Sequence, residues 1–172
     1  MGKVIKCKLD TASLENAIKE LQDYRKGIED KVIVFVNLLL QDGIVVANAR
    51  LGSTIGDSTD AIVGFNVNDG GQLVSAEISL SGPDALFIEF GAGIAYNTGN
   101  QHPKASEFGY GPGTYPSKHP PNRAINPGRW VYRENGEKVW SIGTMASMPI
   151  YHASEEIRNK ITQRAKEVFG SN

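Results

Sequence analysis

Apolar positions in the first part of the chain follow a helical period. The recurring apolar residues are Leu14, Ile18, Leu21, Tyr24 and Ile28. Steps of three and four place such side chains on one face of an α-helix. Asp10, Thr11 or Ser13 can cap its start, and Gly27 is expected to mark its end or a break. The pattern predicts an amphipathic helix over residues 11–28.

Residues 29–50 carry two overlapping patterns. Val32, Val36 and Leu39 begin one helical stripe, whereas the β-branched run and the Asp42-Gly43 pair also fit a hairpin. A continuous pattern of about 20 residues exceeds a usual strand and favours a second helix. The apolar stretch 32–47 is interrupted by polar residues and falls short of the roughly 20 apolar residues of a membrane span, so we expect it in the core.

After a stretch rich in Gly, Ser, Thr and Asp, the period changes to two. Residues 61–67 and 73–80 alternate as strands around an Asn-Asp-Gly-Gly turn. A third strand is expected over 85–90, with Leu86, Ile88 and Phe90 on one face and Glu89 on the other. The pattern predicts a β-meander over residues 59–93.

Residues 94–128 show no apolar period of either kind. They contain six of the eight prolines and five glycines. A connection of this length without regular structure is typical of an assembly or binding loop, although a tolerated surface insertion fits equally well.

The last part of the chain returns to regular patterns. Asn135-Gly136 predicts a type I′ turn within a hairpin over 129–142. Pro149 opens a helix over 149–169 that Gly170 ends. The chain, 1–172, is therefore predicted to be one α+β domain: an antiparallel meander and hairpin, two N-terminal helices over 11–50, one C-terminal helix and a long Pro/Gly-rich loop.

Composition narrows the function. The chain has 172 residues, 40% of them hydrophobic, and a formal net charge of -1, which removes the usual sign of a nucleic-acid binder. Residues 51–100 hold six carboxylates and no Lys or Arg. Such an acidic face suits subunit contacts or exclusion of a polyanion, and a solvated sheet face is the alternative. The only cysteine, Cys7, excludes an intrachain disulfide and is compatible with the cytoplasm.

No arrangement of residues predicts catalysis. Only His102 and His119 with Glu89 could converge as an acid–base or metal set, and Glu89 is more simply a strand carboxylate facing solvent or an arginine. Gly91-Ala92-Gly93 lacks the third glycine of a dinucleotide site. We therefore predict no enzyme activity, cofactor or metal, with a small metal-dependent hydrolase or binding domain as a remote alternative.

Aromatic residues are the candidates for packing and contact. Trp130 and Trp140 on the predicted hairpin are expected to be core or interface anchors, with the core favoured. Tyr110 and Tyr115, between Gly and Pro, resemble a recognition segment or local loop packing.

The order of these motifs resembles a known family. The motifs are the run Ile88-Glu89-Phe90-Gly91-Ala92-Gly93, the Pro/Gly/Tyr-rich loop, Trp130-Val131-Tyr132, Asn135-Gly136, Trp140, Gly143, Ala146, Pro149 and Ala153. Over residues 84–169 the chain resembles the tail-completion, or neck, proteins of long-tailed double-stranded DNA phages. It departs from them at Gly52–Asp57, Met148 and Ile150.

The resemblance implies a structural role in the virion, with assembly in the host cytoplasm. Subunits would form a ring, expected to be hexameric, that joins the head connector or adaptor proteins to the tail terminator or tail tube. DNA would pass through without sequence-specific contact, and no membrane is implied. The expected assembly residues are Phe90, Gly91, Gly93, Tyr110, Tyr115, Trp130, Tyr132 and Trp140. A tail terminator or another minor virion component is the alternative.

Overall fold

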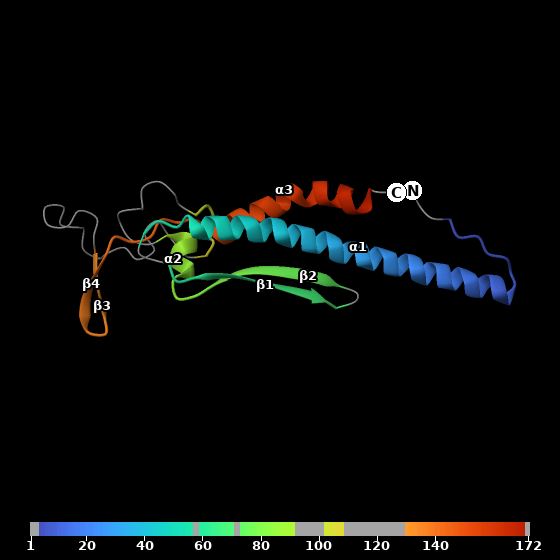
Figure 1. Ribbon diagram of the computed structural model, residues 1–172, viewed down its shortest axis with the longest axis horizontal. Helices are drawn as coiled ribbons and strands as arrows, with labels where there is room; N and C mark the ends of the chain where they lie inside the picture. The colour runs from blue at the N-terminus through green and yellow to red at the C-terminus, as the bar shows by residue number, and fades with distance from the viewer. Residues whose placement is uncertain (1–3, 57–58, 71–72, 92–101, 109–129, 171–172) are drawn as a thin grey trace.

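The computed structural model describes residues 4–56, 59–70, 73–91, 102–108 and 130–170 (Figure 1). Its elements, in chain order, are α1 (Thr11–Gly52), β1 (Ile62–Asp69), β2 (Val74–Ser81), α2 (Ala85–Phe90), β3 (Trp130–Glu134), β4 (Glu137–Ser141) and α3 (Pro149–Phe169). Within these ranges, the strands form two separate antiparallel pairs, β1–β2 and β3–β4. The α+β class predicted from the sequence is confirmed.

Helix α1 is a single element of 42 residues rather than the two helices expected. Asp10 caps it by accepting a bond from the Ser13 N–H at 2.9 Å, as the sequence suggested. Gly27 lies inside the helix and neither ends nor breaks it. The reason is that one glycine costs only about 1 kcal/mol, which continuous packing further along the helix outweighs.

The C-terminal half of α1 is the centre of the fold. Helix α3 packs along one side of it and the β1–β2 hairpin along another (Figure 1). Gly43 permits both contacts, because a Cβ at that position would lie 2.5 Å from Ile78 Cδ1 of β2 and 2.8 Å from Ile157 Cδ1 of α3. The residue that suggested a hairpin turn therefore serves as a close-contact point of a helix.

An ion pair fixes α3 against α1. Arg164 donates from Nε and Nη2 to the two carboxylate oxygens of Asp42, at 2.8 and 2.7 Å, and its Nη1 reaches Glu167. The Arg164 guanidinium holds the pKa of Asp42 below its ordinary value, chiefly through these hydrogen bonds. The pair is mostly shielded from solvent, and its forked geometry fixes orientation as well as contact.

The predicted third strand is wrong, because residues 85–90 form the short helix α2. The meander is thus reduced to the β1–β2 hairpin, whose two strands agree with the prediction. Asp84 turns the chain before α2, since its side chain accepts bonds from the Thr59 and Asp60 N–H groups. A six-residue apolar run has no decisive period, so this tethered turn selected the helix.

The two C-terminal predictions are confirmed. Asn135 and Gly136 have φ values of 50° and 85°, as a type I′ turn requires, between β3 and β4. Helix α3 covers Pro149–Phe169 as predicted. Of the predicted loop 94–128, the structure describes only residues 102–108, which form turns.

One described helix, α1, is long and apolar enough to cross a membrane by length and composition alone; its best window has a mean hydropathy of 1.9. The expectation that this stretch falls short of a span is therefore wrong on composition. Core helices of soluble proteins, which are mostly buried, pass the same test, whereas 17% of this window is buried in the described structure. Here the stretch contacts α3 and β2 and holds the Asp42–Arg164 pair.

Enlarging Gly43 should destabilise the fold. Gly43→Leu forces Ile78 and Ile157 apart and is expected to lower the free energy of unfolding by about 1–3 kcal/mol. Gly27→Ala is the matched control, because nothing lies near a Cβ there, and it should raise stability by about 0.5–1 kcal/mol. Urea unfolding measures both, and equal effects of the two changes would contradict the packing described.

Acid should weaken the α1–α3 contact through Asp42. Because the folded-state pKa of Asp42 is lowered from 3.8, its stabilisation is full above that value and is lost as pH falls through the folded pKa. The free energy of unfolding of wild type and Asp42→Asn should therefore converge as the pH drops below about 4. A difference that stays constant from pH 6 to pH 2 would contradict this account.

Candidate functional site

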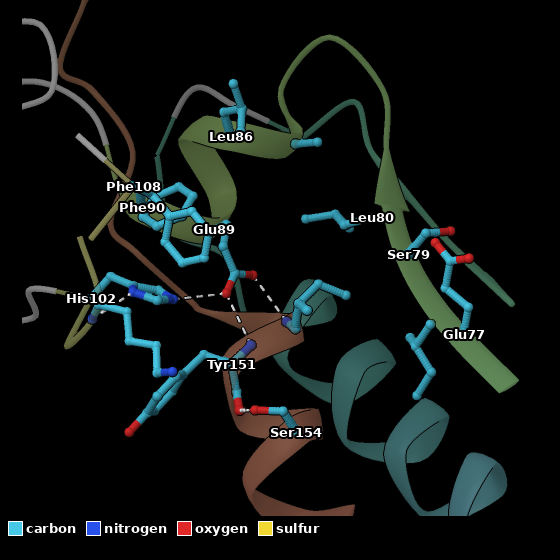
Figure 2. Close-up of a pocket in the computed structure, with 14 residues that line it drawn as sticks. Glu77, Ser79, Leu80, Leu86, Glu89, Phe90, His102, Phe108, Tyr151 and Ser154 are labelled. Atoms are coloured by element: carbon cyan, nitrogen blue, oxygen red, sulfur yellow. Dashed lines mark hydrogen bonds and ion pairs between the residues drawn. The ribbon is translucent and has the colours of Figure 1, made fainter. Parts of the chain in front are cut away.

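The carboxylate of Glu89, near the end of α2, is buried against the start of α3. Its Oε2 accepts a hydrogen bond from the Ile150 N–H and its Oε1 accepts one from the Tyr151 N–H, both at 2.9 Å (Figure 2). Only 8% of Glu89 is exposed. The expectation that this residue faces solvent or an arginine is therefore wrong.

Helix α3 needs this distant cap because its own first residues cannot supply one. Met148, at the N-cap position, is left-handed with φ 55° and makes no side-chain cap. Pro149 has no N–H to donate, so Ile150 and Tyr151 carry the first free donors. A carboxylate at this end also meets the positive end of the helix dipole. Glu89 thus joins α2 to α3 by charge-assisted bonds.

His102 completes the arrangement. Its Nδ1 accepts a bond from the Lys104 N–H at 3.1 Å, so in the neutral ring the proton is on Nε2. Nε2 then donates to Glu89 Oε1 at 3.1 Å. Only 6% of His102 is exposed. The sequence placed these two residues in one candidate set, and the structure brings them together.

Aromatic rings surround this pair. The ring centroid of His102 lies 4.5 Å from that of Phe90 and 5.1 Å from that of Tyr151, and the centroids of Phe108 and Phe90 are 5.8 Å apart. On the far side of Tyr151, burial and the nearby Arg50 lower the pKa of His152. The rings shield the Glu89–His102 bond from water and hold the 102–108 turn on α2 and α3.

A groove of about 660 Å³ opens beside this cluster, between β2, α2 and the start of α3 (Figure 2). Its walls are mainly apolar. They include Ile78 and Leu80 of β2, Leu86 and Phe90 of α2, Phe108, and Ile150 of α3. Glu89 and His102 line its inner end.

Every ring nitrogen and carboxylate oxygen of the Glu89–His102 pair has a hydrogen-bond partner within the protein. Across the described residues, no group of three or more His, Cys, Asp or Glu side chains is placed to hold a metal ion. His119 lies outside the described residues. The arrangement is suited to holding three segments together, and its apolar groove to contact with another chain.

The structure places the expected assembly residues in different surroundings. Phe90 lines the groove, and Gly91 ends α2 with φ 79°, where a side chain would meet Ala146. Trp140 is 53% exposed, so its expected place in the core is wrong. Trp130 and Tyr132 lie on β3 opposite Ser141 and Val139. Gly93, Tyr110 and Tyr115 lie outside the described residues.

Apolar side chains are also exposed far from the groove. Leu14, Ile18, Leu21 and Ile28 form a stripe on the N-terminal half of α1, and each is at least 42% exposed. At the opposite end of the molecule, the β3–β4 hairpin projects away from the helices (Figure 1). There Val131 and Trp140 are cross-strand partners, both exposed.

Comparison with known proteins adds no relative. No family model matches the chain, and neither a curated protein nor a solved structure does. The site is therefore interpreted from its own geometry.

Removing the Glu89 carboxylate should destabilise the fold strongly. Glu89→Ala leaves two N–H groups of α3 and the His102 Nε2–H without an acceptor, and is expected to cost about 3–5 kcal/mol. Glu89→Gln keeps acceptor capacity and should cost less. Glu77→Gln, at an exposed position on β2, is the control, and its free energy of unfolding should stay within about 0.5 kcal/mol of wild type. Thermal and urea unfolding measure all three; Glu89→Ala as stable as the control would refute the capping role.

Proposed function

We propose that this chain is a structural subunit of a phage head–tail junction, a tail-completion or neck protein that assembles into a ring. The proposal is supported by the motif order over residues 84–169 and by the surface of the described subunit. The ring, proposed to be hexameric, joins the head connector or adaptor proteins to the tail terminator or tail tube. The chain acts in the virion after assembly in the host cytoplasm, as a non-enzyme.

The observation that carries the proposal is apolar surface left uncovered in three places. These are the stripe on α1, the groove beside β2, and the Val131–Trp140 face of the projecting hairpin. Large contiguous apolar patches on a soluble subunit mark contact with other chains, and exposed tryptophan is enriched at interfaces. Surfaces at opposite ends of one subunit suit head-to-tail contacts, which close into rings.

The face of β1–β2 turned away from the helices fits the wall of a DNA channel. Most of its side chains are polar, with Ile62 as an exposed apolar residue at one end. The polar residues include Asn66, Asn68, Ser75, Glu77 and Ser79. Neither strand contains Lys or Arg, so within one subunit this face offers phosphates no cation. The face carries fewer carboxylates than the count over residues 51–100 implies, because Asp84 and Glu89 belong to α2 and its N-cap, and of the carboxylates on the two strands only Glu77 lies on this face.

Deletion of the coding sequence from the source replicon tests the proposal. Electron microscopy of lysates should show filled heads accumulating apart from tails, and the complemented control should restore joined particles. Normal infectious particles after deletion would refute the junction role. Tails of abnormal length with the chain located at the tail end would instead support a tail terminator.

Complementation with variants tests the exposed tryptophan. Trp140→Ser is expected to give a folded chain, because the side chain is exposed, yet to restore joined particles at least tenfold less well than wild type. Lys138→Ser, on the same strand and also exposed, is the matched control and should complement fully. Equal complementation by both variants would remove the hairpin from the proposed interface.

A further inference from the structure

One edge of the β1–β2 pair is an unfilled strand position. The Gly70 N–H donates to Leu73 O at 3.0 Å. Because hydrogen-bonded and non-bonded pairs alternate along an antiparallel ladder, this bond fixes which groups of β2 point outward. The outward-pointing N–H and C=O groups of β2 belong to Val74, Ala76, Ile78 and Leu80. In the described part of the chain, no backbone or side-chain group outside the ladder bonds to them.

This edge borders a long apolar groove. A second cavity of about 320 Å³ lies next to the 660 Å³ groove, and both are lined by Ile78, Ile150 and Ser154. β2 forms one wall, α3 the other, and Leu39 and Leu40 of α1 the floor. An extended segment added to β2 would pair with its free backbone groups and place every second side chain in the groove.

The segment just before α1 has the sequence such a strand needs. Ile5, Cys7 and Leu9 alternate with Lys6 and Lys8, an apolar side and a basic side at the period of a strand. The segment lies outside any helix or strand. Its apolar residues are largely open to solvent: Leu9 is fully exposed, Val4 is 78% exposed, and Cys7 is also exposed.

Charge favours the same pairing. With Ile5, Cys7 and Leu9 in the groove, Lys6 and Lys8 lie on the polar face of the sheet, the face that carries Glu77. Among the described residues, Glu77 forms no ion pair. The one lysine that lines the groove, Lys104, is already paired with Glu107 at 3.8 Å. The arriving lysines therefore meet Glu77 on a face whose two strands carry no cation of their own. In the assembled ring, the wall of the proposed channel then carries these two lysines of the neighbouring copy beside Glu77.

The strand cannot come from the same subunit. Leu9 directly precedes the Asp10 cap of α1, whereas the groove begins near Val36. At 1.5 Å per residue these points lie on the order of 40 Å apart along one rigid helix. Leu9 cannot span that distance while α1 is intact, so the donor must be a second copy.

We propose that residues 4–9 of one subunit add as a third strand to β2 of a neighbouring copy, with Ile5, Cys7 and Leu9 in the apolar groove. The inference rests on the proposed self-assembly and names the contact that links the copies. Each subunit gives a strand at one end and receives one at the groove, a head-to-tail exchange that closes into a ring.

Crosslinking through the single native cysteine tests the contact. In Ser154→Cys, which places a thiol in the groove, a short bismaleimide should join Cys7 of one chain to position 154 of another. The expected result is a ladder of covalent multimers, with the joined peptides identified by mass spectrometry. Thr162→Cys, exposed on the same helix, should give no ladder, and Cys7→Ser should abolish it. A ladder of equal strength in Thr162→Cys, or no ladder in Ser154→Cys, overturns the inference.

A second pair of variants separates this contact from self-assembly in general. Leu9→Ser should weaken association about tenfold or more, because a buried leucine is lost. Val4→Ser, on the opposite side of the strand, should leave association within about twofold. Both residues are exposed in the subunit, so its folding is unaffected. Both variants and the wild type are compared by sedimentation. Stable rings of Leu9→Ser would overturn the strand exchange and leave the ring proposal standing. A wild-type chain that stays monomeric in the absence of crosslinker would overturn both proposals.

Discussion

The length of α1 is the constraint on which the rest of the structure depends. It has 42 residues, whereas α3 has 21 and each strand of the hairpin beside it has eight. At the rise of a helix and of a strand, these partners span roughly half of α1. Its C-terminal half is therefore packed and its N-terminal half is bare. The exposed stripe is a direct consequence of this mismatch among the described elements.

The second organising feature is the cap that Glu89 provides to α3. It ties the end of α2 and the 102–108 turn to the first residues of the helix that covers α1. The same contact sets one end of the groove beside β2. Each ring nitrogen of His102 and each carboxylate oxygen of Glu89 is hydrogen-bonded to another part of the protein. These bonds position the three segments relative to one another.

Much of the fold follows from local patterns. The type I′ turn at Asn135-Gly136, the start of α3 at Pro149 and the strands of the first hairpin depend on residues close in sequence, and all were predicted. The helical period also predicted correctly that residues 29–50 are helical. Predictions failed where distant contacts decide. Gly27 does not end α1 because packing beyond it sustains the helix, and residues 85–90 are helical because Asp84 is tethered to the chain some 25 residues earlier.

The site was predictable only in part. Glu89 and His102 could be named as candidates from their chemistry, but nothing near Glu89 in the sequence indicates that it caps a helix about 60 residues later. Trp140 was expected in the core because hairpin tryptophans usually pack inward, and its exposure becomes meaningful only once the isolation of the hairpin is visible. The groove depends on three elements meeting, which no single period in the sequence encodes.

The central claim is that copies of this chain cover the surfaces that one copy leaves bare. Electron cryomicroscopy of the purified full-length chain tests it most directly. The account predicts a closed ring in which neighbouring subunits cover the groove beside β2 and the polar face of β1–β2 lines the central channel. A ring whose channel is lined instead by Lys104, Lys118, Arg123 and Arg129 would contradict the proposed DNA path. Isolated subunits with the groove open at every concentration would contradict the claim itself.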